Sequence, residues 1–226
     1  MTRSFIVSDN LTLSLHEPSL TEDNLGLKTW TSSLLLAKRL EAFSKHVPDG
    51  RPRILELGSG TGLVGLAAAS LWRDHVSEVM LTDLPDIVPN MKRNIKLNQH
   101  LLCDGKPLVN SRVLDWSNAF DAPETADETF LVILAADPIY SADHPAMLAN
   151  TVQKWLKPAS SSRFIVELPL REAYVGERQD LKQRLEAFMD AVEEGEEVGY
   201  DDWETVDGRQ AEVTCWWSVW QPNDFD

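Results

Sequence analysis

The chain of 226 residues is predicted to adopt an α/β fold, in which a mostly parallel sheet is covered by helices on both faces. Between residues 53 and 166, short apolar segments alternate with stretches of helical periodicity. The segment Phe130–Ala136 is apolar at every position, as is typical of a parallel strand buried on both faces. Two further strands are expected near the C-terminus, and a short turn between them predicts an antiparallel hairpin.

The first 50 residues are expected to form an N-terminal extension, a hairpin and a helix, beside the central sheet. Strand-like segments at 5–7 and 11–15, with turn residues between them, predict an N-terminal β-hairpin. A helix is expected to begin near Trp30 and to continue through Leu40, because its apolar residues recur with helical spacing. The turn cluster Pro48–Pro52 separates this part from residues 51–226. No repeat or linker divides the chain, so residues 1–226 are predicted to form a single domain.

A glycine-rich turn follows the first strand of the core. The strand at 53–57 leads into Gly58, Gly60 and Gly62, and a helix is expected from there to about Trp72. Glycine permits a positive φ and leaves space for the backbone to approach a ligand. The helix N-terminus beyond the turn offers N–H groups to a polar ligand. A ligand is therefore expected at the carboxyl ends of the strands, where open α/β sheets bind ligands.

The residues of this turn permit two interpretations. Residues 60–65 fit G-x-G-x-x-G, the pattern of dinucleotide-binding folds. However, the strand runs directly into Gly58, one glycine earlier than that pattern requires, and Glu56 lies two positions before it. This arrangement resembles the first motif of S-adenosylmethionine-dependent methyltransferases more than an NAD-binding turn. A turn that only packs a helix against a sheet would not need three glycines at alternate positions.

The second core strand, 78–82, ends at Asp83, and a helix is expected at 85–98. Asp83 lies about 25 residues beyond the glycine turn, close to the spacing of the ribose-binding acid in dinucleotide folds. A carboxylate at this point can accept both ribose hydroxyls. Asp83 thus supports an adenosine ligand without choosing between S-adenosylmethionine and NAD, although an isolated Asp at a strand end more often caps a turn or helix.

Aromatic and acidic residues follow the third and fourth core strands. The strand at 108–114 is followed by Asp115 and Trp116, whose indole could lie against an adenine base or pack in the core. The strand ending at Ala136 is followed by Asp137, which could instead cap the helix expected from Ser141 to Leu156. The remaining predicted elements are a strand at 164–166, a helix at 180–192 with the acidic end Glu193–Glu197, and strands at 198–206 and 211–220 joined around Asp207–Gly208.

The composition restricts the classes of partner. The net charge of −15 opposes binding along a phosphate backbone, so nucleic acid is an unlikely partner, and it suits a basic protein surface. No apolar run approaches the roughly 20 residues of a membrane-spanning helix, and the N-terminus does not resemble a signal peptide. Cys103 and Cys215 are expected to be reduced thiols of the cytoplasm or nucleus, and no ligand cluster for a metal is expected.

Several segments together resemble the class I, seven-strand protein-lysine methyltransferases of eukaryotes (methyltransferase family 16), which modify translation elongation factors and chaperones. The most specific segment is Asp137–Tyr140, which corresponds to the D-x-x-Y element of that family. The resemblance covers most of the chain and rests on residues 26–30, 55–65, 81–85, 94–98, 114–116 and 137–140. It implies a Rossmann-like, seven-stranded, mostly parallel sheet with the C-terminal antiparallel hairpin. The chain departs from the simplest members of the family in carrying Glu167–Arg171 after the fifth strand, a segment whose role the sequence does not reveal. It looks closer to fungal members that act on elongation factors.

The resemblance also implies a cofactor and a set of site residues. S-adenosylmethionine is the expected cofactor, S-adenosylhomocysteine its product, and no metal is required. Asp137 and Tyr140 are implied to line the opening for the target lysine and to act in catalysis. The implied cofactor contacts are Trp30, Glu56, Gly58, Ser59, Gly60, Asp83, Leu84, Trp116 and Ala136.

The expected substrate is a protein whose basic surface carries the target lysine, with a translation elongation factor as the first candidate. A free lysine has a pKa of about 10.4, so the acceptor must lose a proton before it can attack a methyl group. Asp137 is assigned to binding and orienting the incoming lysine ammonium. The proton that this ammonium loses is expected to pass to water, or to leave with help from Tyr140. A monomer in the cytoplasm, and also in the nucleus, is expected. The alternatives are methylation of a small molecule or of RNA, an adaptor that only binds the cofactor, and a nicotinamide oxidoreductase.

Overall fold

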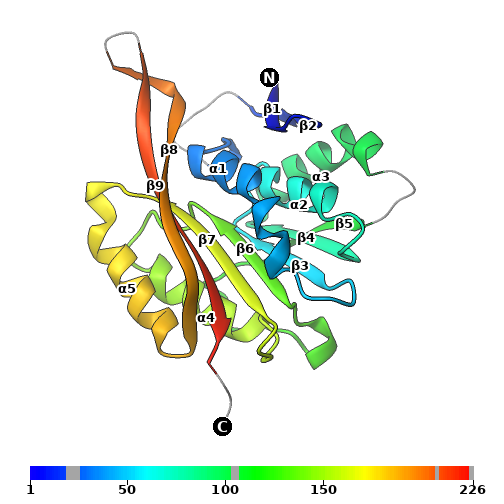
Figure 1. The fold of residues 1–226 in the computed structure, drawn as a ribbon, viewed down its shortest axis with the longest axis vertical. Helices are drawn as coiled ribbons and strands as arrows, with labels where there is room; N and C mark the ends of the chain where they lie inside the picture. Colours follow the sequence, from blue (N-terminus) through cyan, green and yellow to red (C-terminus); the bar gives the residue numbers. More distant parts are fainter. Residues whose placement is uncertain (19–25, 103–106, 207–208, 224–226) are drawn as a thin grey trace.

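The computed structural model describes residues 1–18, 26–102, 107–206 and 209–223, and its centre is a twisted seven-stranded sheet (Figure 1). The strand order is β5-β4-β3-β6-β7-β9-β8, and β9 runs antiparallel to both of its neighbours, whereas the other neighbouring pairs are parallel. This confirms the predicted fold class. The strands of the sheet are β3 (Arg53–Leu57), β4 (Glu78–Asp83), β5 (Leu108–Val113), β6 (Val132–Ala136), β7 (Arg163–Pro169), β8 (Met189–Val206) and β9 (Arg209–Pro222).

Helices cover both faces of the sheet, as Figure 1 shows. One face packs against α1, α2 and α3, and the other against α4 and α5. The α-helices are α1 (Thr31–Arg39), α2 (Leu63–Leu71), α3 (Val88–Leu97), α4 (His144–Trp155) and α5 (Val175–Glu186). Short 3-10 helices lie at η2 (Ala42–His46), η3 (Gln99–Leu101), η5 (Ala126–Glu128) and η6 (Glu172–Tyr174).

The central strands are apolar because both of their faces are covered. In β6, Val132 and Leu134 face the side of α1 and α2, while Ile133 and Ala135 face the side of α4 and α5, and all four are fully buried. The continuous apolar run at this strand thus contributes side chains to two separate hydrophobic cores, one on each face of the sheet.

The predicted N-terminal hairpin is present as a separate two-stranded sheet, β1 (Thr2–Ser8) and β2 (Leu11–His16). Side-chain amides of α3 attach it to the body of the fold: Ser14 N–H donates to Asn98 Oδ1 at 2.9 Å, and His16 N–H donates to Asn94 Oδ1 at 2.7 Å. The amide nitrogen of Asn94 also donates to the carbonyl of Thr61 in the glycine turn at 2.9 Å. The hairpin is therefore connected to the segment that forms the ligand crevice.

The helix predicted at 180–192 is wrong in its second half. The helix α5 ends at Glu186, and β8 begins at Met189, so the acidic residues Glu193–Glu197 lie in a strand. Inward-facing positions of this strand carry Glu193 and Glu197 in place of apolar residues, and these pair with His46 at 2.7 Å and Arg39 at 2.6 Å. Because the strand lacks apolar alternation, its sequence shows no strand periodicity. The turn predicted at Asp207–Gly208 lies outside the described residues.

We expect replacement of Gly65 by alanine to destabilise the fold. Gly65 lies where α2 crosses the sheet, and a Cβ there would overlap the Leu81 side chain and lie 2.6 Å from Glu56 Oε2. Overpacking of this kind costs about 1–3 kcal/mol, which urea unfolding followed by circular dichroism would measure. Gly176→Ala in α5 is the matched control, because a Cβ there meets nothing within 4 Å and alanine favours the helix. Equal effects of the two changes would contradict close packing at Gly65.

Candidate functional site

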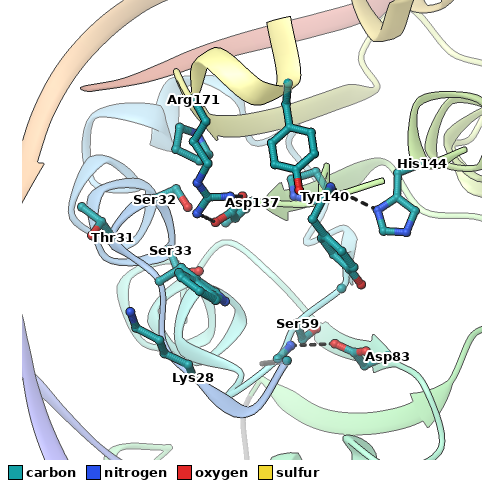
Figure 2. A pocket seen from close by; sticks show the side chains of 18 of the residues that line it. Lys28, Thr31, Ser32, Ser33, Ser59, Asp83, Asp137, Tyr140, His144 and Arg171 are labelled. Carbon is teal, nitrogen blue, oxygen red and sulfur yellow. Dashed lines mark hydrogen bonds and ion pairs between the residues drawn. The ribbon is translucent and has the colours of Figure 1, made fainter. Parts of the chain in front are cut away.

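A cavity of about 990 Å³ lies at the carboxyl ends of the central strands and beside the N-terminus of α1 (Figure 2). Its position agrees with the crevice expected at the end of β3. The structure brings ten of the eleven predicted site residues to its wall: Trp30, Gly58, Ser59, Gly60, Asp83, Leu84, Trp116, Ala136, Asp137 and Tyr140.

The glycine turn forms one wall of the cavity in a conformation that requires glycine. Gly58, Gly60 and Gly62 have φ angles of +63°, +54° and +84°. A Cβ at Gly60 would lie 2.9 Å from the carbonyl oxygen of Gly26, and one at Gly58 would lie 3.2 Å from the ring of Trp116. The glycine positions of the turn therefore suit no larger residue, and there the backbone is open to a ligand.

Asp83 is fixed at the end of β4 by backbone groups. One carboxylate oxygen accepts the N–H of Gly60 at 2.8 Å, and the other accepts the N–H of Leu84 at 2.8 Å. Burial raises the pKa of Asp83, and these two hydrogen bonds act against the rise. A carboxylate oxygen has more than one lone pair, so each can accept a further hydrogen bond from a hydroxyl in the cavity.

Glu56 is the predicted site residue that the cavity wall does not include. Its side chain is buried below the turn, where Oε2 accepts the N–H of Gly65 at 3.0 Å. Burial raises the pKa of Glu56 to about 8. From this position the side chain supports the first turn of α2, and its assignment as a direct cofactor contact stays a prediction.

Asp137 and Arg171 form an ion pair at the wall opposite the glycine turn (Figure 2). Arg171 Nη1 donates to Asp137 Oδ1 at 3.0 Å, and Nη2 donates to Oδ2 at 2.8 Å. Asp137 has a φ of +51°, and its N–H donates to the carbonyl of Glu167 at 2.9 Å. Burial raises the pKa of Asp137, and the Arg171 guanidinium opposes that rise. Nothing in the sequence analysis identified this partner, although Arg171 ends the segment whose role was open.

Tyr140 lies at the mouth of the cavity, with 59 % of its surface exposed. Its ring meets that of His144 edge to face, with the centroids 4.1 Å apart, and its N–H donates to His144 Nδ1 at 3.3 Å. Burial and the nearby carboxylates of Asp83 and Asp137 raise the pKa of Tyr140, so the phenol stays protonated near neutral pH. His144, which sequence reasoning missed, has a pKa lowered by burial.

Trp30 belongs to the cavity wall, and two cations lie over its ring. Lys28 Nζ is 4.2 Å from the ring centroid, and Arg171 Cζ is 5.3 Å from it. Lys28 also pairs with Asp201 of β8 at 3.2 Å. This arrangement links the segment before α1 to β8 and to the segment that follows β7.

The N-terminus of α1 also faces the cavity, through Thr31, Ser32 and Ser33. Ser32 is 1 % exposed, and within the part of the chain that the structure describes its hydroxyl has no hydrogen-bond partner. A buried polar atom without a partner is costly, and one that lines a cavity is suited to a polar ligand. No group of three His, Cys, Asp or Glu side chains that could hold a metal ion occurs among the described residues.

We expect Glu167 to make stability fall as the pH rises. The side chain is fully buried in β7, and burial together with Glu197 raises its pKa to about 9, against the influence of Arg39. In the unfolded chain the group loses its proton near pH 4.5. Between these two values the folded chain binds the extra proton, so stability declines with increasing pH, by at most about 1.4 kcal/mol per pH unit.

Glu167→Gln should remove this decline, so its gain in unfolding free energy over the wild type should increase from about pH 5 to about pH 9. Urea unfolding at several pH values would measure the difference. Glu186→Gln, at an exposed position of α5, is the control and should run parallel to the wild type. Parallel curves for Glu167→Gln as well would show that this carboxyl does not titrate between the two states.

Comparisons with known proteins give consistent results. A family model described as lysine methyltransferase matches residues 7–194. The chain is 41 % identical over 212 residues to the protein-lysine N-methyltransferase EFM2 of Saccharomyces cerevisiae, covering 86 % of this chain and 49 % of that protein. It is 36 % identical over 227 residues to the protein-lysine N-methyltransferase rrg1 of Schizosaccharomyces pombe, covering 97 % of this chain and 70 % of that protein. The chain thus spans only about half the length of the first of these relatives.

Solved structures share the fold at low sequence identity. A putative RNA methyltransferase from Pyrococcus horikoshii has a TM-score of 0.62 at 10 % identity, with 92 % of both chains covered. The structure described as M. jannaschii TYW2 in complex with AdoMet has a TM-score of 0.53 at 14 % identity, with 98 % of this chain and 87 % of the other covered. Among the described residues, no helix has the length and apolar character needed to cross a membrane.

Proposed function

The chain belongs to the lysine methyltransferase family, and from this premise we propose that it transfers methyl groups from S-adenosylmethionine to lysine side chains of a protein. The observation that carries the proposal is that one cavity joins two sets of residues. Gly58, Gly60 and Asp83 form one set, Asp137 and Tyr140 form the other, and all five line the same cavity. A cofactor site and an acceptor site need this proximity, because catalysis of group transfer depends on holding both reactants in line.

The residues of the cavity fit S-adenosylmethionine. Asp83 can accept hydrogen bonds from ribose hydroxyls, and Trp116 lies beside the turn, where it can contact an adenine base. The N–H groups at the start of α1 and the unpartnered hydroxyl of Ser32 suit a carboxylate, which is the other end of the molecule. The glycine turn provides the close backbone approach between them.

When bound, S-adenosylmethionine supplies an electrophilic methyl group. The chain must present the acceptor nitrogen with a free lone pair, and a lysine with a pKa of about 10.4 is protonated in neutral water. An apolar, partly closed site lowers that pKa, because burial favours the neutral form. The protonated phenol of Tyr140 at the cavity mouth can hydrogen-bond to the amine and orient it. The proton that the acceptor loses passes to water.

The substrate that we propose is a protein with a basic surface around the target lysine. The net charge of −15 supports a basic partner, and exposed Glu212 lines the site. A translation elongation factor is the first candidate, because the family that the chain resembles includes enzymes that act on such factors. We further propose that the protein acts as a monomer in the cytoplasm and also in the nucleus.

A labelling experiment tests the proposal. The purified chain is incubated with tritiated S-adenosylmethionine and an extract of cells that lack it, and labelled material is separated and identified by mass spectrometry. We expect a labelled protein band with methyl groups on lysine. Label that disappears on ribonuclease treatment, label in small molecules only, or cofactor binding without any label would each overturn the proposed function.

A further inference from the structure

We infer that Arg171 is a positioning residue that keeps the acceptor lysine uncharged, and that the task of Asp137 is to hold Arg171 in place. This inference rests on the proposed function and deepens it. It replaces the expectation from sequence that Asp137 draws in the ammonium form of the lysine.

The burial of the two partners carries the inference. The Asp137 side chain is 4 % exposed, whereas the Arg171 side chain is 35 % exposed. Both carboxylate oxygens are engaged by the guanidinium, at 2.8 and 3.0 Å. An amine that enters the cavity therefore meets the positive end of the pair and not the carboxylate.

Arg171 is held in position from several directions. Its carbonyl accepts a hydrogen bond from Arg178 Nη1 at 2.7 Å, and the preceding N–H of Leu170 donates to the carbonyl of Thr214 at 2.7 Å. The guanidinium also lies over the ring of Trp30. A guanidinium fixed by a bidentate pair and an aromatic face has little freedom to move aside.

The other charges around the pair are engaged by groups of their own. Lys28 of the segment before α1 pairs with Asp201 of β8, and Asp83 of β4 accepts two backbone N–H groups. Asp115 accepts hydrogen bonds from Ser117. The remaining ionisable groups on the wall are Tyr140, His144, Tyr174 and the solvent-exposed Glu212.

Behind the pair lie Glu167 of β7, Glu197 of β8 and Cys215 of β9, which act on one another electrostatically. The pKa of Glu167 is raised to about 9, so this group is uncharged near neutral pH, and Glu197 pairs with Arg39. Neither Glu167 nor Glu197 is thus an unpaired carboxylate that would offset the charge of Arg171.

A fixed cation beside an amine disfavours its protonated form and lowers its pKa. Arg171 therefore raises the fraction of acceptor lysine that has a free lone pair, and the released proton goes to water at the open mouth of the cavity. If Asp137 were unpaired, its charge would raise the pKa of the lysine and oppose transfer.

The test compares Arg171→Gln, Arg171→Lys and the wild type by the pH dependence of kcat at saturating substrate, because kcat reports ionisations in the enzyme–substrate complex. The substrate is the protein that the wild-type chain labels in the extract experiment. Activity should rise with pH as the acceptor lysine loses its proton. For Arg171→Gln we expect the midpoint of this rise to move up by about one pH unit, so that activity is roughly tenfold lower near neutral pH and recovers at high pH. The direction holds whether Asp137 is charged or protonated in the variant, because the cation is lost in both cases. Arg171→Lys retains the charge and should keep the midpoint of the wild type.

Arg184→Gln is the matched control, because it removes a cation from the outer side of α5, where Arg184 pairs with Asp180. Calorimetric affinity for S-adenosylmethionine and a circular dichroism spectrum, measured for each variant, separate loss of cofactor or of folding from the effect on the acceptor. An equal loss of activity at every pH, or an unchanged midpoint in folded Arg171→Gln, would overturn the inference. Absence of lysine label with the wild type would instead overturn the proposed function.

Discussion

Replacing Asp137 by asparagine is expected to lower methyl transfer by about a hundredfold or more, because small misplacements in an acceptor site have effects of this size. The change keeps the shape of the side chain, and asparagine tolerates the positive φ of this position. It removes the charge that holds Arg171, and breaking one partner of a buried pair is strongly unfavourable. The rate of tritium transfer to the labelled protein measures the effect.

The affinity of Asp137→Asn for S-adenosylmethionine should stay within about threefold of the wild type, since the ribose and glycine-turn contacts lie on the other wall. Calorimetry measures this affinity directly. Asp127→Asn, at an exposed position away from the cavity, is the control and should leave both quantities unchanged. An equal loss of transfer and of cofactor affinity would assign Asp137 to the cofactor side of the site.

The second large effect is expected at Asp83, where alanine should weaken the affinity for S-adenosylmethionine about a hundredfold. Hydrogen bonds to a charged acceptor contribute about 1.5–3 kcal/mol each, and a loss of about 2.8 kcal/mol corresponds to a hundredfold change. The alanine also frees the N–H groups of Gly60 and Leu84, which the carboxylate now orders. Titration calorimetry with S-adenosylmethionine and with S-adenosylhomocysteine gives the measurement.

Two further variants serve as an intermediate case and as a control for the Asp83→Ala measurement. Asp83→Asn keeps one acceptor oxygen and should lose about tenfold in affinity. Asp86→Ala, at an exposed position three residues later, should bind the cofactor like the wild type. If Asp83→Ala bound within about threefold of the wild type, Asp83 would not be the ribose acceptor that we propose.

Much of the core could be predicted from the sequence because its signals are local. The apolar strand at Val132–Ala136 and the glycines at Gly58, Gly60 and Gly62 mark a strand and a turn through their own residues. Glu56 shows the limit of such reasoning. Side chains alternate along β3, so the residue that lies two positions before Gly58 points under α2 and not into the cavity.

The rest could not be predicted because it depends on pairs that are distant in the sequence. Arg171 and Asp137 are 34 residues apart, and they meet because β6 and β7 are neighbours whose carboxyl ends lie at the same edge of the sheet. In the same way, Glu193 and Glu197 can occupy a strand because His46 and Arg39 come from distant elements. No periodicity in one segment contains that information.

The acidic stretch Glu193–Glu197 also affects how the protein behaves at high concentration. It lies in β8, the last strand in the order of the sheet, whose outer backbone groups could pair with the sheet of another copy. Four of these five positions are glutamates, and Glu193 and Glu197 point inward to cations of their own chain, so a second edge that paired here would desolvate these charged groups. Charged side chains at such a boundary disfavour edge-to-edge pairing of two copies.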